Sequence, residues 1–251
     1  MADLAMLERD GSAVRLILNR PEARNALSQE LIEALRARVR DIATMDDVQV
    51  CVITGAGRAF CAGMDLRAVL DDAAAARRLL HGIAELTIDV WSLPMVTVAQ
   101  VTGAAIGGGC GLMSVCDIVI THRGAKLGYP EVDLGVCPAV VAPWLVERIG
   151  AGAARRVLLT GGLLSAERAV SLGLATSASR DVEGLNAEVD QTVARLRAAA
   201  PIALRATKAW VNSTTDKKVF DLVRRGALIS AEVLEEPSAR EALASAFTRR
   251  R

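Results

Sequence analysis

Glycine is concentrated at one point of the sequence, where the five residues Gly107–Gly111 include four glycines. An apolar run that predicts a buried strand precedes this segment, and Leu112–Val115 continues it as a predicted helix. The N–H groups at the start of a helix have no partner inside the helix, and glycine leaves them uncovered. Such a helix start attracts negative charge. The alternative is a tight turn or a close crossing of two backbone segments.

The carboxyl group of Glu131 stands among apolar residues and directly after Pro130. Burial would raise its pKa and let it exchange a proton near neutral pH. The alternative is a glutamate on the surface or at the start of a helix. Asp133 could offer a second carboxyl, although a residue two positions away can face elsewhere. A third segment, Ala59–Leu66, has small residues after Phe60, so it could bring bare backbone to a ligand or form a surface turn.

Other kinds of site are missing from the sequence. Counted from Gly107, the third glycine that a dinucleotide-binding motif requires falls on Leu112. Neither a phosphate-binding Gly-Lys-Ser/Thr motif nor a metal-ligand spacing occurs. His81 and His122 have no serine or cysteine partner in a nucleophile motif. The five cysteines form no Cys-x-x-Cys pair, which favours reduced and mostly buried thiols in a cytosolic protein.

The composition is that of a soluble globular protein of 251 residues, with 52% hydrophobic and 24% charged residues. A net charge of +1 argues against a dedicated nucleic-acid binder, and 3% aromatic residues argue against base stacking. The first ten residues lack the apolar core of a signal peptide. The longest apolar stretches are interrupted before they reach the length of a membrane span. We therefore expect a soluble protein without a nucleic-acid or membrane partner.

These chemical groups need a scaffold, and the first half of the chain predicts an α/β core with a largely parallel sheet. Apolar runs predict buried strands, and Ser28 is a good cap for a helix that ends near Thr44. A second helix is predicted to run from Asp71 to Leu93 and to end before Pro94. The predicted strands are Val14–Leu18, Val48–Thr54, Met95–Val101 and Ile118–Thr121.

From Val140 onward the pattern is helical almost throughout. Ser165 is a candidate cap for a short helix, and Gly173 stands where a left-handed residue would end it. A change in composition predicts two regions, 1–184 as the α/β core and 185–251 as a helical region. The later helices are predicted at Glu188–Ala199, Ile202–Val211, Lys217–Leu234 and Ser238–Phe247.

Taken together and in order, the motifs resemble the enoyl-CoA hydratase/isomerase (crotonase) family from about Val14 to the C-terminus. The glycine-rich segment, the Glu131 segment and the Ala59–Leu66 segment all contribute. The further motifs are Asn19-Arg20-Pro21-Glu22, Asn25-Ala26-Leu27, Val52-Ile53-Thr54-Gly55, Cys116-Asp117-Ile118, Leu159-Thr160-Gly161, Ala166 and Gly173-Leu174.

The resemblance implies a crotonase-like spiral of strand–strand–helix repeats with a C-terminal helical region for oligomerisation. The protein would be a cytoplasmic homotrimer or a hexamer built as a dimer of trimers. Its substrate would be an acyl-CoA thioester, with no separate cofactor and no metal. The thioester oxygen would accept hydrogen bonds from the backbone N–H groups of Met64 and Gly108, which form an oxyanion hole. Loss of one such donor typically costs about 3–4 kcal/mol of transition-state stabilisation.

By the same resemblance, Glu131 matches one of the two catalytic glutamates of the family, but Gly111 occupies the position of the other. Two-glutamate hydratases hold a water molecule between their carboxylates, although some hydratases of the family also lack the first glutamate. One carboxylate is enough to move a proton between C2 and C4 of an enoyl-CoA. The sequence therefore predicts hydration of an enoyl-CoA double bond, with 3-enoyl-CoA isomerisation and a non-catalytic CoA-ester binder as alternatives.

Two departures concern the acyl part of the substrate. Ala139 stands where dienoyl-CoA isomerases and the aryl-CoA dehalogenase have an aspartate, which argues against both activities. Trp144 would reshape the acyl pocket, or alternatively pack against the C-terminal helices.

Arg24 and the basic end Arg249–Arg251 are candidates for contact with the CoA moiety. The predicted substrate-binding residues are Arg24, Ala26, Ala62, Asp65, Leu66, Gly111 and Trp144.

Overall fold

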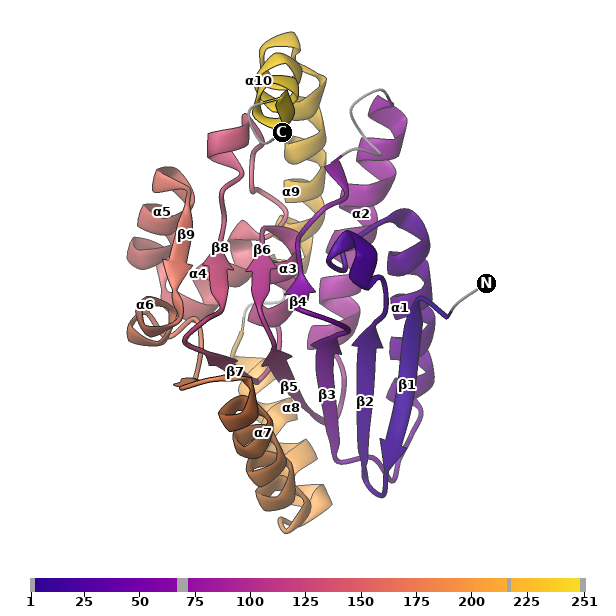
Figure 1. The fold of residues 1–251 in the computed structure, drawn as a ribbon. Coiled ribbons are helices and arrows are strands. Elements are labelled where there is room, and N and C mark those ends of the chain that lie inside the picture. Colours follow the sequence, from indigo (N-terminus) through magenta and orange to yellow (C-terminus); the bar gives the residue numbers. More distant parts are fainter. Residues whose placement is uncertain (1–2, 67–71, 216–217, 249–251) are drawn as a thin grey trace.

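A computed structural model describes residues 3–66, 72–215 and 218–248, and it is an α/β structure with two sheets (Figure 1). The larger sheet has the strand order β1-β2-β3-β5-β7-β10. Its only antiparallel pair among the described residues is β1 with β2, and the other neighbours are parallel. The strands are β1 (Ala5–Asp10), β2 (Ala13–Leu18), β3 (Val50–Gly55), β5 (Val96–Val101), β7 (Ile118–His122) and β10 (Ser177–Ser179).

The predicted strands are confirmed in type and position, because β2, β3, β5 and β7 all fall on the apolar runs. Every residue of β3 and of β5 is buried, as expected for central parallel strands that are covered on both faces. Strand β1 is an edge strand that the sequence analysis did not predict. Its second half, Glu8–Asp10, is exposed, so it lacks the apolar run that identified the others.

A smaller sheet has the strand order β4-β6-β8-β9. The sequence analysis did not locate its individual strands. Each of the first three strands follows a strand of the larger sheet after a short turn and leads toward a helix, which is the predicted strand–strand–helix repeat. Glycine makes one of these turns possible, because a Cβ at Gly103 would lie 2.1 Å from the carbonyl oxygen of Arg58. The strands are β4 (Ala59–Cys61), β6 (Ala104–Ile106), β8 (Lys126–Gly128) and β9 (Leu163–Ser165).

The helices of the first half largely follow the prediction. Helix α1 (Gln29–Ala43) is capped by Ser28, whose Oγ accepts a hydrogen bond from Leu31 N at 3.3 Å. Helix α2 (Ala73–Trp91) is described from its cap Asp72, so the predicted start at Asp71 lies outside the described residues. The remaining helices of this region are α3 (Gly108–Ser114), α4 (Ala142–Ile149), α5 (Ala151–Thr160) and α6 (Ala166–Ser171).

Helix α7 (Val182–Arg197) begins before the predicted Glu188, because the side chain of Asp181 caps it by accepting from Gly184 N at 2.9 Å. The division proposed at residue 184 falls inside this helix and stays a prediction. Helices α8 (Pro201–Thr214), α9 (Lys218–Glu235) and α10 (Pro237–Thr248) complete the chain, and α9 packs along α2 (Figure 1). Within the described residues, no helix is both long and apolar enough to cross a membrane.

Candidate active site

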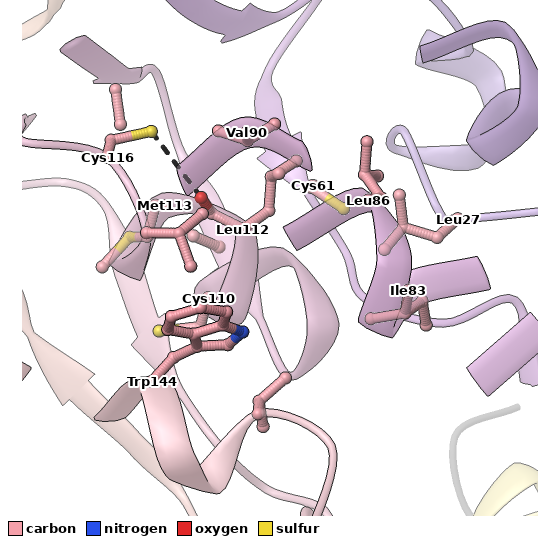
Figure 2. Packing of buried hydrophobic residues seen from close by; sticks show 14 of the residues in the cluster. Leu27, Cys61, Ile83, Leu86, Val90, Cys110, Leu112, Met113, Cys116 and Trp144 are labelled. Carbon is pink, nitrogen blue, oxygen red and sulfur yellow. Dashed lines mark hydrogen bonds between the residues drawn. The ribbon is translucent and has the colours of Figure 1, made fainter. Parts of the chain in front are cut away.

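The backbone N–H of Gly108 is the first of helix α3 and lies at its open end. Gly107 N donates to Gly128 O at 2.8 Å, and Gly111 N donates to Gly107 O at 2.8 Å, a bond of the first turn of the helix. Among the described residues, Gly108 N has no backbone acceptor, as expected for a first-turn amide. Leu27 and Ile83 cover the α-carbon, since a Cβ at Gly108 would lie 3.3 and 3.5 Å from their side chains, and Figure 2 shows both in this part of the core.

The segment that carries Met64 pairs with Leu27 in an isolated parallel bridge. Leu27 N donates to Gly63 O at 2.8 Å and Asp65 N donates to Leu27 O at 3.0 Å. In this pattern the N–H of Met64 itself points away from Leu27. The bridge lies next to the start of α3, because a Cβ at Gly63 would lie 3.7 Å from Gly108 N. The structure thus brings the amides of Met64 and Gly108 into the same small region.

A buried asparagine holds this region together. Asn25 is fully buried and has a left-handed backbone with φ of 55°. Its Oδ1 accepts from Arg20 N at 2.9 Å, and its Nδ2 donates to the carbonyl oxygens of Ala56 and Ala59 at 2.9 and 2.8 Å. The loop that leads to Leu27 is therefore fixed against the turn between β3 and β4. The sequence analysis quoted Asn25 only as part of a family motif and assigned it no role.

Glu131 follows strand β8 and places its carboxyl against Gly107. A Cβ at Gly107 would lie 2.7 Å from Oε1 of this glutamate, so only glycine leaves room for the carboxyl. The residue as a whole is half-buried, but its Oε2 is closed off from solvent and has no hydrogen-bond partner among the described residues. Burial raises the pKa of Glu131 to about 7, against the smaller opposing effect of a backbone hydrogen bond. The group can therefore gain or lose a proton near neutral pH.

The structure offers no second carboxyl beside Glu131 from Asp133. The Oδ2 of Asp133 accepts a hydrogen bond from Gly162 N at 2.8 Å, so this side chain fixes the loop before β9. Gly111, at the position of the other family glutamate, faces Val141. A Cβ at Gly111 would lie 2.4 Å from Val141 Cγ1. The space that a side chain at position 111 would need is occupied by an apolar group.

Trp144 lies in an aromatic cluster with Trp91 of α2 and Phe220 of α9, at ring-centroid distances of 6.1 and 6.0 Å. It is 2% exposed, and its Nε1 donates to Thr87 Oγ1 at 2.9 Å. Figure 2 shows Trp144 in the same buried cluster as Cys110 of α3. This placement is the packing against the C-terminal helices that the sequence allowed as an alternative, and a contact with substrate stays a prediction.

The other predicted substrate-binding residues lie around the two amides. Arg24 is exposed, has a φ of 54°, and accepts from Ala62 N at 3.0 Å through its carbonyl oxygen. Asp65 pairs with Arg20 at 2.7 Å. Ala26, Ala62 and Leu66 are half-buried. The basic end Arg249–Arg251 lies outside the described residues.

Arg148 of α4 is a residue that the sequence analysis missed. Its guanidinium donates to the carbonyl oxygens of Ser114, Cys116 and Leu174 at 3.1, 2.6 and 2.9 Å. Two of these carbonyls belong to the end of α3 and the turn after it, where a positive charge stabilises the helix dipole. The only sequence signal was an arginine in the last turn of an amphipathic helix, which many surface helices share.

The two sheets, the strand–strand–helix repeats and the C-terminal helices together define a protein of the crotonase fold class. A sequence model of the family described as enoyl-CoA hydratase/isomerase matches residues 8–246. The chain belongs to the enoyl-CoA hydratase/isomerase family and is an acyl-CoA-processing enzyme.

Relatives cover nearly the whole chain. A Thermus thermophilus protein, provisionally named an enoyl-CoA hydratase, is 34% identical over 96% of this chain and 96% of its own. A crotonyl-CoA hydratase of Syntrophomonas wolfei is 31% identical over 82% of this chain and 80% of its own. The crystal structure of an enoyl-CoA hydratase from Bacillus halodurans has a TM-score of 0.90 and 23% identity, covers 96% of this chain and 99% of its own, and supports the fold alone.

Proposed function

We propose that the protein hydrates the double bond of an enoyl-CoA thioester. The observation that carries this proposal is the buried Glu131 carboxyl, which lies against Gly107 at the point where the Gly108 amide is free. The names of the relatives agree with hydration, since the Thermus thermophilus and Syntrophomonas wolfei proteins are both named hydratases. No cofactor or metal enters the proposed reaction, because the CoA is part of the substrate.

In the proposed reaction, the thioester oxygen accepts hydrogen bonds from the amides of Met64 and Gly108. The Glu131 carboxylate takes a proton from water while the water oxygen bonds to C3 of the substrate. The electron pair of the double bond moves toward the thioester, and the two amides stabilise the resulting enolate oxygen. C2 then receives the proton from the Glu131 carboxyl. One molecule of water has been added, and Glu131 is a carboxylate again.

A second candidate reaction is the isomerisation of a 3-enoyl-CoA to a 2-enoyl-CoA. The contact between Gly111 and Val141 favours it, because the site then has one carboxyl group and isomerisation needs only one. Glu131 would take a proton from C2 and return it to C4 of the same substrate. The same pair of amides would stabilise the enolate.

We also propose that the protein is a cytoplasmic trimer or a dimer of trimers and that it serves fatty-acid or related acyl-CoA metabolism. These assignments rest on the resemblance to the family. Light scattering tests the first, since a trimer or hexamer would have three or six times the chain mass of 26.5 kDa.

The assay that tests the proposed function follows the thioester absorbance of crotonyl-CoA and of a 3-enoyl-CoA. Loss of the crotonyl-CoA double bond supports hydration, and conversion of the 3-enoyl-CoA supports isomerisation. The Glu131→Gln variant should lose a hundredfold or more in turnover while its KM stays within about threefold, because proton transfer is lost and the amides remain. Unchanged turnover in this variant would remove Glu131 from the mechanism.

A further inference from the structure

Gly111 has one close neighbour outside its own helix, the side chain of Val141. Outside its own helix and within the described residues, a Cβ built at Gly111 would meet Cγ1 and Cβ of Val141, at 2.4 and 3.1 Å. Contacts of this length do not occur between real side chains, so no residue larger than glycine fits at position 111 while Val141 keeps its place. Both residues are fully buried or nearly so.

Glu131 and Val141 each fill the space beside a glycine at the start of α3. Gly107, the residue that caps the helix with a φ of 53°, faces the Glu131 carboxyl, and Gly111, four residues later, faces Val141. An apolar group therefore stands where a side chain at position 111 would begin.

The position of Val141 is fixed by the turn before α4 and by helix α9. Val141 N donates to Pro138 O at 3.2 Å, and Ser230 Oγ of α9 donates to Cys137 O at 2.7 Å. Four residues before Ser230, a Cβ at Gly226 would lie 2.1 Å from Ala139 O, so α9 rests directly on this backbone. Val141 has little freedom to move away from Gly111.

We infer that Val141 is a specificity-determining residue, which occupies the place of a second acid–base group and leaves every proton transfer of the reaction to Glu131. This inference rests on the proposed function for its consequence, but the packing that it describes can be tested without activity. The inference explains why residue 111 is glycine, since Val141 fills the space that a larger side chain at position 111 would need.

The first test is a double-mutant cycle on the complete chain, read as thermal stability. Gly111→Ala alone should lower the Tm because the new methyl group overlaps Val141. In the Val141→Ala background the same change should cost much less Tm, since the overlap with Cγ1 at 2.4 Å is gone and only the contact with Cβ at 3.1 Å remains. A Gly111→Ala effect of the same sign and size in both backgrounds would overturn the inference.

The second test concerns the surroundings of Glu131, whose charge interacts with the buried side chains of Cys110 and Tyr129. Burial raises the pKa of both, the former to about 12, so they stay neutral near pH 7. Because the inference places Val141 at the second acid–base position, Val141→Ser should lower the midpoint of the Glu131 titration, since a hydroxyl group or a water near the carboxyl favours its charged form. Carbon-13 NMR of labelled glutamate reads this midpoint, and Glu131→Gln identifies the signal.

Val140→Ser is the matched control, a buried valine one residue earlier whose backbone nitrogen lies against Gly226 of α9. A lowered midpoint in Val141→Ser alone supports the inference. An unchanged midpoint in Val141→Ser, or an equal shift in the control, overturns it. Full turnover in Glu131→Gln would instead overturn the proposed function and leave this titration result intact, so the two failures are distinguishable.

Discussion

The chemistry of the site depends on a carboxyl group that the fold keeps out of water. Burial raises the pKa of Glu131 from 4.5 to about 7, so the folded protein binds a proton that the unfolded chain has released between these two pH values. The stability of the fold must then decrease as pH rises from 4.5 to 7 and stay lower above 7. A shift of this size corresponds to roughly 3 kcal/mol, which is an upper bound for the cost of holding the charged group in place.

Glu131→Gln removes this cost, so we expect the variant to gain stability over the wild type as pH rises. The expected gain between pH 5 and pH 8 is up to about 3 kcal/mol in the free energy of unfolding. Urea denaturation at the two pH values measures it. If the variant and the wild type differ by the same free energy of unfolding at pH 5 and at pH 8, then folding does not raise the pKa of the Glu131 carboxyl.

The sequence identified Glu131 as a candidate but could not establish its burial. Burial comes from Gly107, twenty-four positions earlier in the chain, and the contact between them depends on how β8 lies beside the start of α3. The sequence analysis assigned no role to Val141, and its contact with Gly111 could not be inferred from spacing. Residue types thus indicated the chemistry, and tertiary contacts decide which groups share one site.

The elements around the site are joined by an ion pair between the sheet and the C-terminal helices, in which the lysine is buried and the aspartate side chain is 30% exposed. Lys208 of α8 is 8% exposed, and its Nζ donates to Asp117 Oδ2 at 2.7 Å and to Met95 O at 2.8 Å. The same carboxyl accepts from the N and Oγ1 of Thr97 on β5 at 2.7 and 2.9 Å. Asp117 therefore ties helix α8 to the start of β7 and to a central strand.

We expect Lys208→Met to lower the free energy of unfolding by about 2–3 kcal/mol, because the partly buried carboxyl of Asp117 would lose its ion-pair partner and Met95 O would lose a hydrogen-bond donor. Adding Asp117→Asn should recover part of this loss, since the amide carries no charge and keeps one acceptor for Thr97. Chemical denaturation of both variants measures the two values. A double variant that is no more stable than Lys208→Met would contradict the role of the charge.

At the scale of elements, the sequence predicted what local pattern encodes. The strands β2, β3, β5 and β7 are apolar runs, and Ser28 and Ser165 cap helices α1 and α6 as expected. The strands of the smaller sheet have three residues each, which is too short for a periodic pattern. Their existence depends on pairing between segments that are far apart in the chain, so the structure was needed to find them.

At the scale of the whole molecule, helix α9 connects the C-terminal region with the candidate active site. It lies along α2, where Arg224 pairs with Glu85 and Arg77 pairs with Glu235 at 2.7 and 2.6 Å. It also rests on the segment before α4 through Gly226 and Ser230. The C-terminal helices therefore help to support the candidate site.

Gly226→Ala tests this connection, because the new methyl group would lie about 2 Å from Ala139 O and force α9 and the segment apart. We expect the free energy of unfolding to fall by about 2–3 kcal/mol, and turnover to fall as well, since Val141 follows Ala139 by two residues and would shift. Arg225→Ala, on the exposed side of the same helix, is the control and should change both by little. Chemical denaturation and the hydration assay measure the two effects. A Gly226→Ala variant with reduced stability but normal turnover would mean that α9 supports the fold without positioning the site.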